Sequence, residues 1–264
     1  MDRSKIIRYS ASNSIFEFSL LSTVGDRSEQ QDSFGYSLKD DGGIILICDG
    51  MGGHSDGSIA SSIAVDMIIN AYRECSPNED VDGLMLQTLK DVDNRIHFMA
   101  NEDGGPSNAG TTSVGVIIEK DDLKWFSVGD SRAYIFRNGE FAQLTKDHNY
   151  KTVLEEQREV GVIGETEYLE GLSRGEQLIN YLGIGNLSLI DYSISPFKIK
   201  SGDVIMVMSD GLYRLVSNTE INRYITRYKN TAECLEALEA CAEDTSKVNQ
   251  VSRDNMTIFL ISIK

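Results

Sequence analysis

Hydrophobic residues form two uninterrupted runs in this chain, and each run ends in an aspartate followed by glycine. Residues 44–48 are Ile-Ile-Leu-Ile-Cys, between a pair of glycines and Asp49-Gly50. The second run, Val204–Met208, leads into Ser209-Asp210-Gly211. A short apolar run bounded by turn residues predicts a buried strand. Each run therefore places a carboxylate at the end of a strand in the protein core.

Weaker patterns predict the other elements. We expect further strands at 15–24, 34–38, 111–119, 123–129, 132–137, 140–144, 188–194 and 255–263. Helical spacing predicts helices at 57–73, 80–101, 212–216, 218–229 and 231–246. Residues 151–186 are charged and weakly periodic, and we expect a surface excursion of lower order there. No repeat or linker interrupts the chain, so residues 1–264 are expected to form a single domain.

The order of these elements predicts an α+β layered fold. The helix pair at 57–101 should cover one sheet and the C-terminal helices another. With 41% hydrophobic residues the chain can bury a substantial core. The formal net charge of −16 argues against nucleic-acid and anionic-membrane partners, which need basic surfaces. No apolar run approaches a membrane span, and the N-terminus lacks a signal-peptide core, so we expect a soluble, cytoplasmic protein.

The chemistry of the four cysteines is limited. None belongs to a C-x-x-C pair, which argues against a thiolate zinc site. None is followed six residues later by arginine, so the loop of a cysteine-based phosphatase is absent. Cys48 lies within the first apolar run and is expected to be a core residue.

Four aspartates occupy strand boundaries and are the main candidates for a functional site. Asp49 and Asp210 end buried strands, Asp254 precedes one, and Asp130 follows Gly129 between two strands. If these strands are neighbours, the carboxylates converge, and like charges a few ångströms apart need protons or cations. Oxygen ligands suit Mg²⁺ or Mn²⁺, and a pair of such ions activates water for phosphoryl displacement. The alternative for each aspartate is a capping role at a turn.

A set of short motifs, spread in order over roughly residues 15–263, resembles the PPM/PP2C family of metal-dependent protein phosphatases, of the bacterial kind. The matching segments are Arg27 with Gln30-Gln31-Asp32; Asp49-Gly50-Met51-Gly52-Gly53-His54; Gly110-Thr111-Thr112; Val128-Gly129-Asp130-Ser131-Arg132-Ala133; Leu144-Thr145-Lys146-Asp147-His148; Gly202-Asp203; Ser209-Asp210-Gly211-Leu212; and Arg253-Asp254-Asn255-Met256-Thr257. The resemblance implies a four-layer αββα sandwich, with two central antiparallel β-sheets flanked by helices.

The resemblance also implies a set of metal ligands. Asp49 bridges two Mn²⁺ or Mg²⁺ ions, and the carbonyl of Gly50 binds one of them. Asp210 and Asp254 hold the other ion. Asp130, together with Asp210, binds a third and weaker ion.

Further roles concern the substrate and the proton. Arg27 binds the phosphate bidentately, which guanidinium geometry favours. His54 is the general acid that protonates the leaving serine or threonine oxygen. Asp32 orients metal-bound water from outside the ligand set. A hydroxide bound by the two metal ions attacks the phosphorus without a covalent phosphoenzyme. The substrates are proteins phosphorylated on serine or threonine by a partner kinase, and the enzyme is expected to act as a monomer.

The sequence departs from the family pattern at two places. Gln31 stands where some members have a further carboxylate ligand. Residues 151–186, which we call the flap, match the family's variable segment near the site only loosely. His148 lies in a motif but is expected to be structural.

Other functions remain as alternatives. The first is a catalytically silent module of this fold that binds phosphoproteins or a regulatory partner. An aspartyl-phosphate phosphatase needs a D-x-D loop after a strand, and Asp91-Val92-Asp93 lies in a helical pattern. A metal nuclease would share the carboxylates but fits the negative charge poorly.

Overall fold

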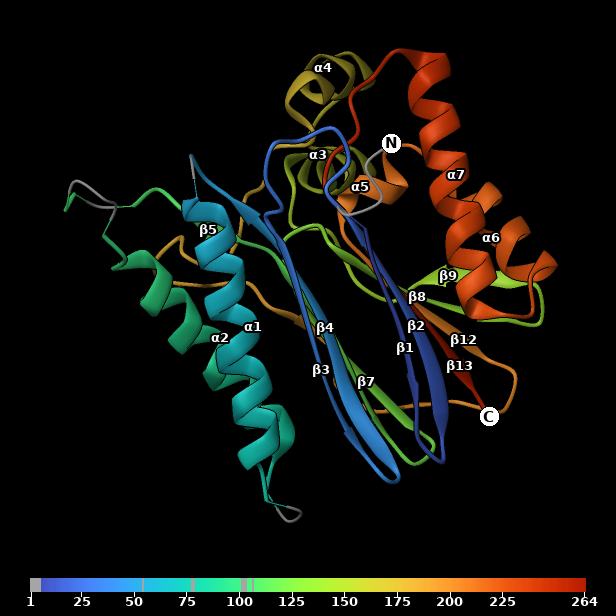
Figure 1. Cartoon of the computed structure of the whole chain (residues 1–264). Coiled ribbons are helices and arrows are strands. Elements are labelled where there is room, and N and C mark those ends of the chain that lie inside the picture. The colour runs from blue at the N-terminus through green and yellow to red at the C-terminus, as the bar shows by residue number, and fades with distance from the viewer. Residues whose placement is uncertain (1–5, 54, 77–78, 101–103, 106) are drawn as a thin grey trace.

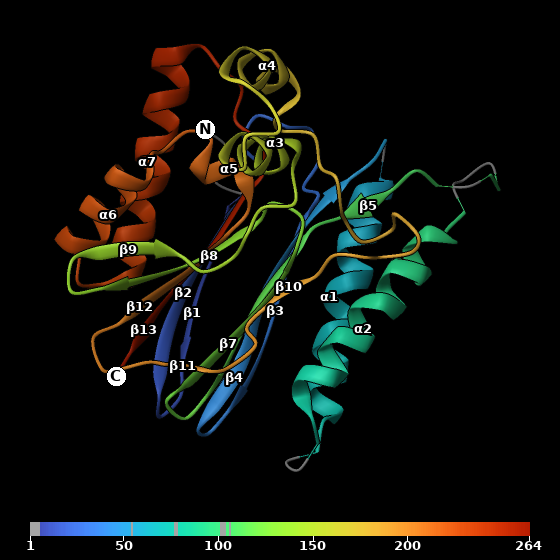
Figure 2. The ribbon, with the colours of Figure 1, turned by 180° about the vertical axis from the view of Figure 1, so that it is seen from behind.

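Two β-sheets face each other at the centre of the molecule, and helices cover both outer faces (Figures 1 and 2). The computed structural model describes residues 6–53, 55–76, 79–100, 104–105 and 107–264. All strand pairings within this part of the chain are antiparallel. The α+β, four-layer αββα sandwich predicted from the sequence is therefore confirmed.

The strands divide between the sheets as follows. In the described residues one sheet has six strands in the order β1-β2-β13-β12-β8-β9: β1 (Ile6–Ser12), β2 (Phe16–Thr23), β8 (Arg132–Arg137), β9 (Glu140–Gln143), β12 (Val204–Met208) and β13 (Met256–Ile263). The other follows the order β10-β7-β6-β4-β3, with β11 beside β7 and β5 beside β4: β3 (Asp32–Lys39), β4 (Gly42–Met51), β5 (Gly110–Thr111), β6 (Ser113–Glu119), β7 (Asp122–Val128), β10 (Asp191–Tyr192) and β11 (Phe197–Lys198).

The helices form the two outer layers and one end of the sandwich. α1 (Asp56–Glu74) and α2 (Val81–His97) cover the sheet that contains β4, whereas α6 (Asn218–Arg227) and α7 (Thr231–Asn249) cover the sheet that contains β12 (Figures 1 and 2). α3 (Tyr150–Glu159), α4 (Glu165–Gly171), a 3₁₀ turn η2 (Leu172–Arg174) and α5 (Asp210–Tyr213) lie near one end. No helix in the described ranges is long and apolar enough to cross a membrane.

The two apolar runs are explained by burial on both faces of their sheets. In β4, Ile44, Leu46 and Cys48 pack under α1 and α2, and the alternate residues Ile45 and Ile47 pack between the sheets. Successive side chains of a strand point to opposite faces, so a strand covered on both sides is apolar at every position.

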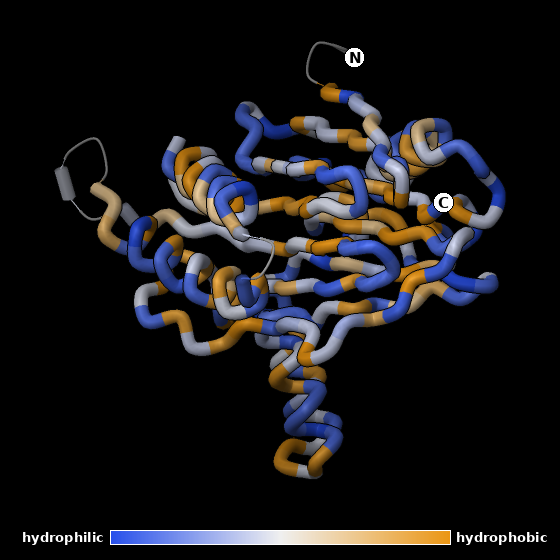
Figure 3. The backbone as a smooth tube through the Cα atoms, turned by 90° about the horizontal axis from the view of Figure 1, so that it is seen from below, coloured by the Kyte–Doolittle hydropathy of each residue, from blue (hydrophilic) through white to orange (hydrophobic). Residues whose placement is uncertain are grey.

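β12 repeats this arrangement on the other side of the sandwich. Ile205 and Val207 pack between the sheets, and Met206 and Met208 pack under α6 and α7. Figure 3 shows the hydrophobic positions gathered along the strands in the middle of the molecule.

The sequence-based assignment was wrong at three places. The flap is not of low order. Asn149 caps the start of α3, because its side chain accepts a hydrogen bond from the Thr152 N–H at 3.0 Å, and Leu154 of this helix is buried. β1 was not predicted, because it is a largely exposed edge strand without apolar alternation. The strand expected at 188–194 shrinks to the two residues of β10.

Candidate active site

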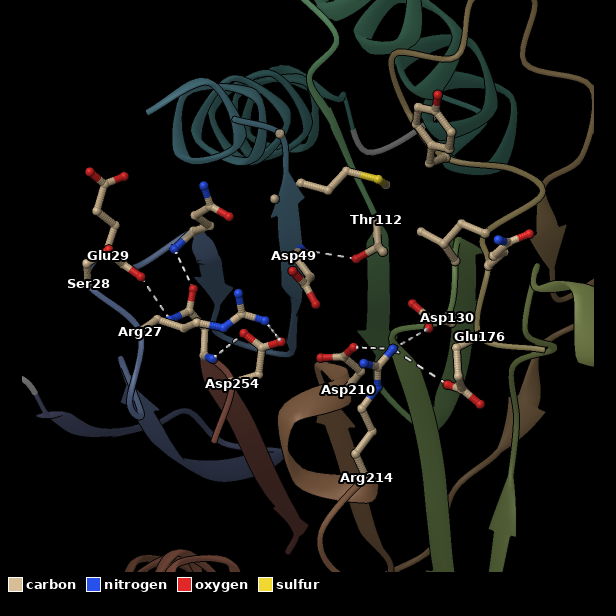
Figure 4. Close-up of a pocket in the computed structure, with 18 residues that line it drawn as sticks. Arg27, Ser28, Glu29, Asp49, Thr112, Asp130, Glu176, Asp210, Arg214 and Asp254 are labelled. Atoms are coloured by element: carbon tan, nitrogen blue, oxygen red, sulfur yellow. Dashed lines mark hydrogen bonds and ion pairs between the residues drawn. The ribbon is translucent and has the colours of Figure 1, made fainter. Parts of the chain in front are cut away.

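The predicted carboxylates lie together at one end of the sandwich, where the two sheets meet (Figure 4). Asp49 stands near the end of β4, and its cross-strand partner Asp32 begins β3. Asp210 follows β12 in the other sheet, and Asp254 precedes β13. Asp130 lies in the turn that leads from β7 in one sheet to β8 in the other. Residues far apart in the sequence are thus brought to one place by the strand ends, as predicted.

The backbone around Asp49 is fixed by the neighbouring Thr111-Thr112 segment. The Asp49 N–H donates to Thr112 Oγ1 at 3.0 Å, and the Thr112 N–H donates to the Asp49 carbonyl at 2.8 Å. The Thr111 hydroxyl donates to the same carbonyl at 2.9 Å. These bonds leave the Asp49 carboxylate to project into the centre of the site.

Two glycines let the segments that carry the carboxylates approach each other closely. A Cβ on Gly50 would lie 2.1 Å from the carbonyl oxygen of Gly57 at the start of α1. A Cβ on Gly211 would lie 2.1 Å from the carbonyl oxygen of Asn255. Both distances are far shorter than any real contact, so each position requires glycine. Gly211 in this way joins the segment of Asp210 to that of Asp254.

Burial and mutual repulsion raise the free energy of the ionised carboxylates, and so raise their pKa values. Burial, together with the charge of Asp254, raises the pKa of Asp32 and of Asp210 to about 6. Burial, followed by the charge of Asp210, raises the pKa of Asp130 to about 7. The pKa of Asp49 is raised well above its usual range by burial and then by the surrounding aspartates. A bound cation would relieve this repulsion.

Two arginines already pair with the carboxylates. Arg27 Nη2 lies 2.7 Å from Asp254 Oδ2, and Arg214 Nη2 lies 2.8 Å from Asp210 Oδ2 (Figure 4). Within the described residues, no three His, Cys, Asp or Glu side chains are arranged to hold one metal ion. In the two ion pairs, Asp254 and Asp210 each turn one carboxylate oxygen toward a guanidinium group.

Asp32 supplies an independent sign that the site accommodates a further group. Its Oδ2 accepts a hydrogen bond from the Ser209 hydroxyl at 2.8 Å. Its Oδ1 is buried and has no hydrogen-bond partner among the described residues. A buried acceptor without a donor is costly unless water or another ligand occupies the space beside it. The all-oxygen donor set and this unpaired oxygen fit hydrated Mg²⁺ or Mn²⁺.

A cavity of about 1000 Å³ lies over the carboxylates. Arg27 stands at one side of it, and the flap borders the other side through Glu176, Leu178 and Tyr181. Its full lining is Arg27, Ser28, Glu29, Gln31, Asp49, Gly50, Met51, Gly52, Thr112, Asp130, Glu176, Gln177, Leu178, Tyr181, Asp210, Arg214, Asp254 and Asn255. The cavity is polar, wide and accessible to a phosphorylated side chain.

Of the two histidines considered in the sequence analysis, the structure describes His148 but not His54. His54, the predicted general acid, lies outside the described residues. His148 is buried, and its Nδ1 accepts a hydrogen bond from the Gly129 N–H at 3.2 Å. Burial lowers the pKa of His148 to about 4, so its imidazole is neutral at physiological pH. His148 holds the turn that carries Asp130, which agrees with the structural role expected for it.

Sequence reasoning assigned no role to several residues that support the site, although Thr112 and Ser209 lie in the quoted motifs. Thr112 and Ser209 fix Asp49 and Asp32, and Arg214 pairs with Asp210. A signal was present for Arg214, because it follows Asp210 by four residues and such pairs share one face of a helix. Thr112 belongs to one of the quoted motifs, but its contact with Asp49 was not predicted, since a strand pairing brings the two residues together.

Comparison with known proteins places this chain in a family. The serine/threonine phosphatase stp of Listeria monocytogenes is 28% identical over 240 residues, covering 89% of this chain and 90% of that protein. The solved structure of the S. agalactiae serine/threonine phosphatase has a TM-score of 0.81 at 27% identity, covering 97% of this chain and 100% of that one.

A second solved structure shares the fold at lower identity. The catalytic domain of the serine/threonine phosphatase PstP, solved in complex with two manganese ions, has a TM-score of 0.71 at 21% identity, over 94% of this chain and 98% of that one. The family model for protein phosphatase 2C matches residues 22–246. The chain belongs to the PPM/PP2C family of protein phosphatases.

Proposed function

We propose that this chain is a protein phosphatase that hydrolyses phosphoserine and phosphothreonine with the help of two Mn²⁺ or Mg²⁺ ions. The observation that carries the proposal is the convergence of Asp49, Asp210, Asp254 and Asp130 from two sheets on one cavity, with Arg27 beside them. Family membership and the names of the relatives support the reaction class. The complex of PstP with two manganese ions supports the choice of metal.

The residues present would share the work as follows. Asp49, the Gly50 carbonyl, Asp210 and Asp254 would hold the ions. The ions, when bound, would lower the pKa of water and offset charge on the phosphate. Asp32, which keeps an unpaired oxygen, would accept a hydrogen bond from water and so orient it.

The substrate requires two further groups. Arg27 would exchange Asp254 for the phosphate, since its guanidinium can donate two parallel hydrogen bonds to either partner. His54 would donate a proton to the leaving serine or threonine oxygen. No side chain becomes phosphorylated in this scheme. Phosphoproteins made by a partner kinase are the proposed substrates, and the flap, which borders the cavity through Glu176, is the segment placed to contact their sequence.

The test is hydrolysis of p-nitrophenyl phosphate and of a phosphothreonine peptide with Mn²⁺, with Mg²⁺ and with EDTA. Turnover of both substrates that stops in EDTA and returns with Mn²⁺ is the expected result. Folded protein, checked by circular dichroism, that turns over neither substrate with either ion would contradict the proposal. That outcome would favour a catalytically silent module that binds phosphoproteins, and phosphopeptide binding without turnover would support it.

A further inference from the structure

Arg214 lies between the carboxylates of the site and the flap. Its Nη2 is 2.8 Å from Asp210 Oδ2, 3.5 Å from Glu176 Oε2 and 3.9 Å from Asp130 Oδ2. Figure 4 shows the guanidinium among these three side chains. The side chains of Asp130 and Asp210 are only 5% and 11% exposed, so their charges are poorly screened by water. A single guanidinium thus stands beside two buried carboxylates from separate segments, the turn between β7 and β8 and the start of α5.

The main chain fixes Arg214 in this place. It follows the short helix α5 directly and caps its C-terminus, where the Arg214 N–H donates to the Asp210 carbonyl at 3.1 Å. That helix is held against the segment before β13 by the close approach of Gly211 to Asn255. A charge separated by four residues from its partner in a helix lies on the same face. The guanidinium is therefore positioned by the same element that positions Asp210.

The neighbouring Tyr213 completes the environment of Asp130. Its hydroxyl lies 3.1 Å from both Asp130 Oδ2 and the Asp130 carbonyl oxygen, and it can donate to either. The Tyr213 ring packs under the guanidinium of Arg132 at 3.5 Å, and Arg132 forms a two-pronged ion pair with Asp147. Asp130 is thus supplied with a hydrogen-bond donor and a positive charge from adjacent residues of one helix.

This arrangement conflicts with a third metal ion between Asp130 and Asp210. An ion bound by both carboxylates would lie within contact distance of a guanidinium that stays protonated at every physiological pH. A divalent cation and the guanidinium, whose side chain is 41% exposed, would repel each other beside these two buried carboxylates. We propose that Arg214 is a built-in cation that replaces the third ion, so that this protein binds two divalent ions and no third.

Arg214 also connects the site to the flap, through its contact with Glu176. Glu176 belongs to the flap, and it is the flap residue that pairs with Arg214. Because one guanidinium contacts both Asp210 and Glu176, it joins the segment that borders the cavity to a residue proposed to hold a metal ion. The link is made by a protein side chain and does not depend on the metal concentration.

The inference rests on the proposed function, and counting bound ions tests the two separately. The number of Mn²⁺ ions bound per chain is measured by equilibrium dialysis, up to millimolar Mn²⁺, for the wild type and for Arg214→Met, which keeps an unbranched side chain but removes the guanidinium and its charge. We expect two ions in the wild type and three in Arg214→Met. Arg214→Lys, which keeps the charge, should bind two.

Two more variants serve as controls. Glu176→Gln removes the flap pair and leaves Asp130 and Asp210 beside Arg214, so two ions are expected. Asp130→Asn keeps the shape of the side chain and should also bind two ions, with the affinities of the wild type. This variant tests the inference even if Arg214→Met fails to fold, because loss of an ion from Asp130→Asn would show that Asp130 binds metal in the presence of Arg214.

Each outcome supports or overturns one of the proposals. Three ions in the wild type, or two in folded Arg214→Met, would overturn the role of Arg214 and leave the proposed function standing. No bound ion in the folded wild type would overturn the metal-dependent function and, with it, the inference about Arg214. Two ions in the wild type and three in Arg214→Met would support both.

Discussion

The site combines groups held by strand ends with groups carried on loops, and the two kinds differ in how firmly they are placed. Asp49 ends a strand that is buried on both faces, and its backbone is fixed by Thr112. Arg27 lies in an exposed loop, and its side chain is 59% exposed. An exposed ion pair such as that between Arg27 and Asp254 contributes little to stability and is readily exchanged. The comparison suggests that strand ends supply fixed charge for metal ions, and that loops supply groups that respond to the substrate.

The largest loss of turnover is expected when a carboxylate at a strand end is changed. Asp210→Asn removes the charge of a proposed ligand without changing its shape, and we expect turnover to fall by roughly a thousandfold or more, because metal ions supply several kcal/mol of transition-state stabilisation. The measurement is steady-state hydrolysis of p-nitrophenyl phosphate with Mn²⁺, with circular dichroism to verify the fold. Asp66→Asn, at an exposed position of α1, is the matched control. Activity like that of the wild type in Asp210→Asn would contradict the ligand assignment.

The next effect concerns His54, which the sequence places after the glycines that follow β4. His54→Gln should slow hydrolysis of a phosphothreonine peptide by roughly a hundredfold or more, the usual contribution of a general acid. p-Nitrophenyl phosphate has a leaving group that needs no proton, so its hydrolysis should fall much less. The ratio of the two rates, measured on one enzyme preparation, isolates the proton transfer. Equal losses on both substrates would exclude His54 as the acid.

Removing the loop arginine should have a smaller effect. Arg27→Ala is expected to lower kcat/KM by roughly 10- to 100-fold, since a hydrogen bond to a charged group contributes about 1.5–3 kcal/mol. Because Arg27 also pairs with Asp254, its loss should leave Mn²⁺ binding as tight as in the wild type or tighter. The affinity is measured by Mn²⁺ titration beside the kinetics, with Arg73→Ala at an exposed end of α1 as the control. Weaker Mn²⁺ binding in Arg27→Ala would contradict this division of roles.

The smallest effect is predicted for Cys48, which lies one residue before Asp49. Its thiol is fully buried, its Sγ contacts Ser113 Oγ at 3.6 Å, and burial raises its pKa to about 12. A thiol in this state is not a nucleophile. Cys48→Ser should keep its activity within about twofold of the wild type, as expected for a residue that only packs. An inactive but folded variant, judged by kinetics and circular dichroism, would point to a thiol mechanism.

The contrast between strand ends and loops also determined what could be predicted from the sequence. The runs before Asp49 and Asp210 are apolar at every position because both faces of each sheet are covered, so these strands and their terminal carboxylates were evident. β1 was not evident, because among the described strands it pairs with β2 alone and most of its residues are exposed. The helices of the flap were missed because few of their residues are buried.

The cation beside Asp130 was missed for a different reason. The position of Arg214 four residues after Asp210 gives one of its contacts, but Asp130 and Glu176 reach it through the pairing of strands and the path of the flap. Local periodicity carries no information about such contacts. The motifs predicted where the aspartates lie together, but only the fold shows which positively charged side chains pair with them.

The two glycines beside the aspartates have a consequence for how this protein can change over evolutionary time. Neither Gly50 nor Gly211 has a side chain to contribute to the proposed chemistry, yet any side chain at these positions would meet a carbonyl oxygen at 2.1 Å. A survey of all single substitutions would therefore find these positions as intolerant as the aspartates they follow. Sequence change in this part of the molecule is therefore restricted by the close approach of main-chain segments as well as by catalysis. Each Asp-Gly pair combines the two restrictions, one on the aspartate and one on the glycine.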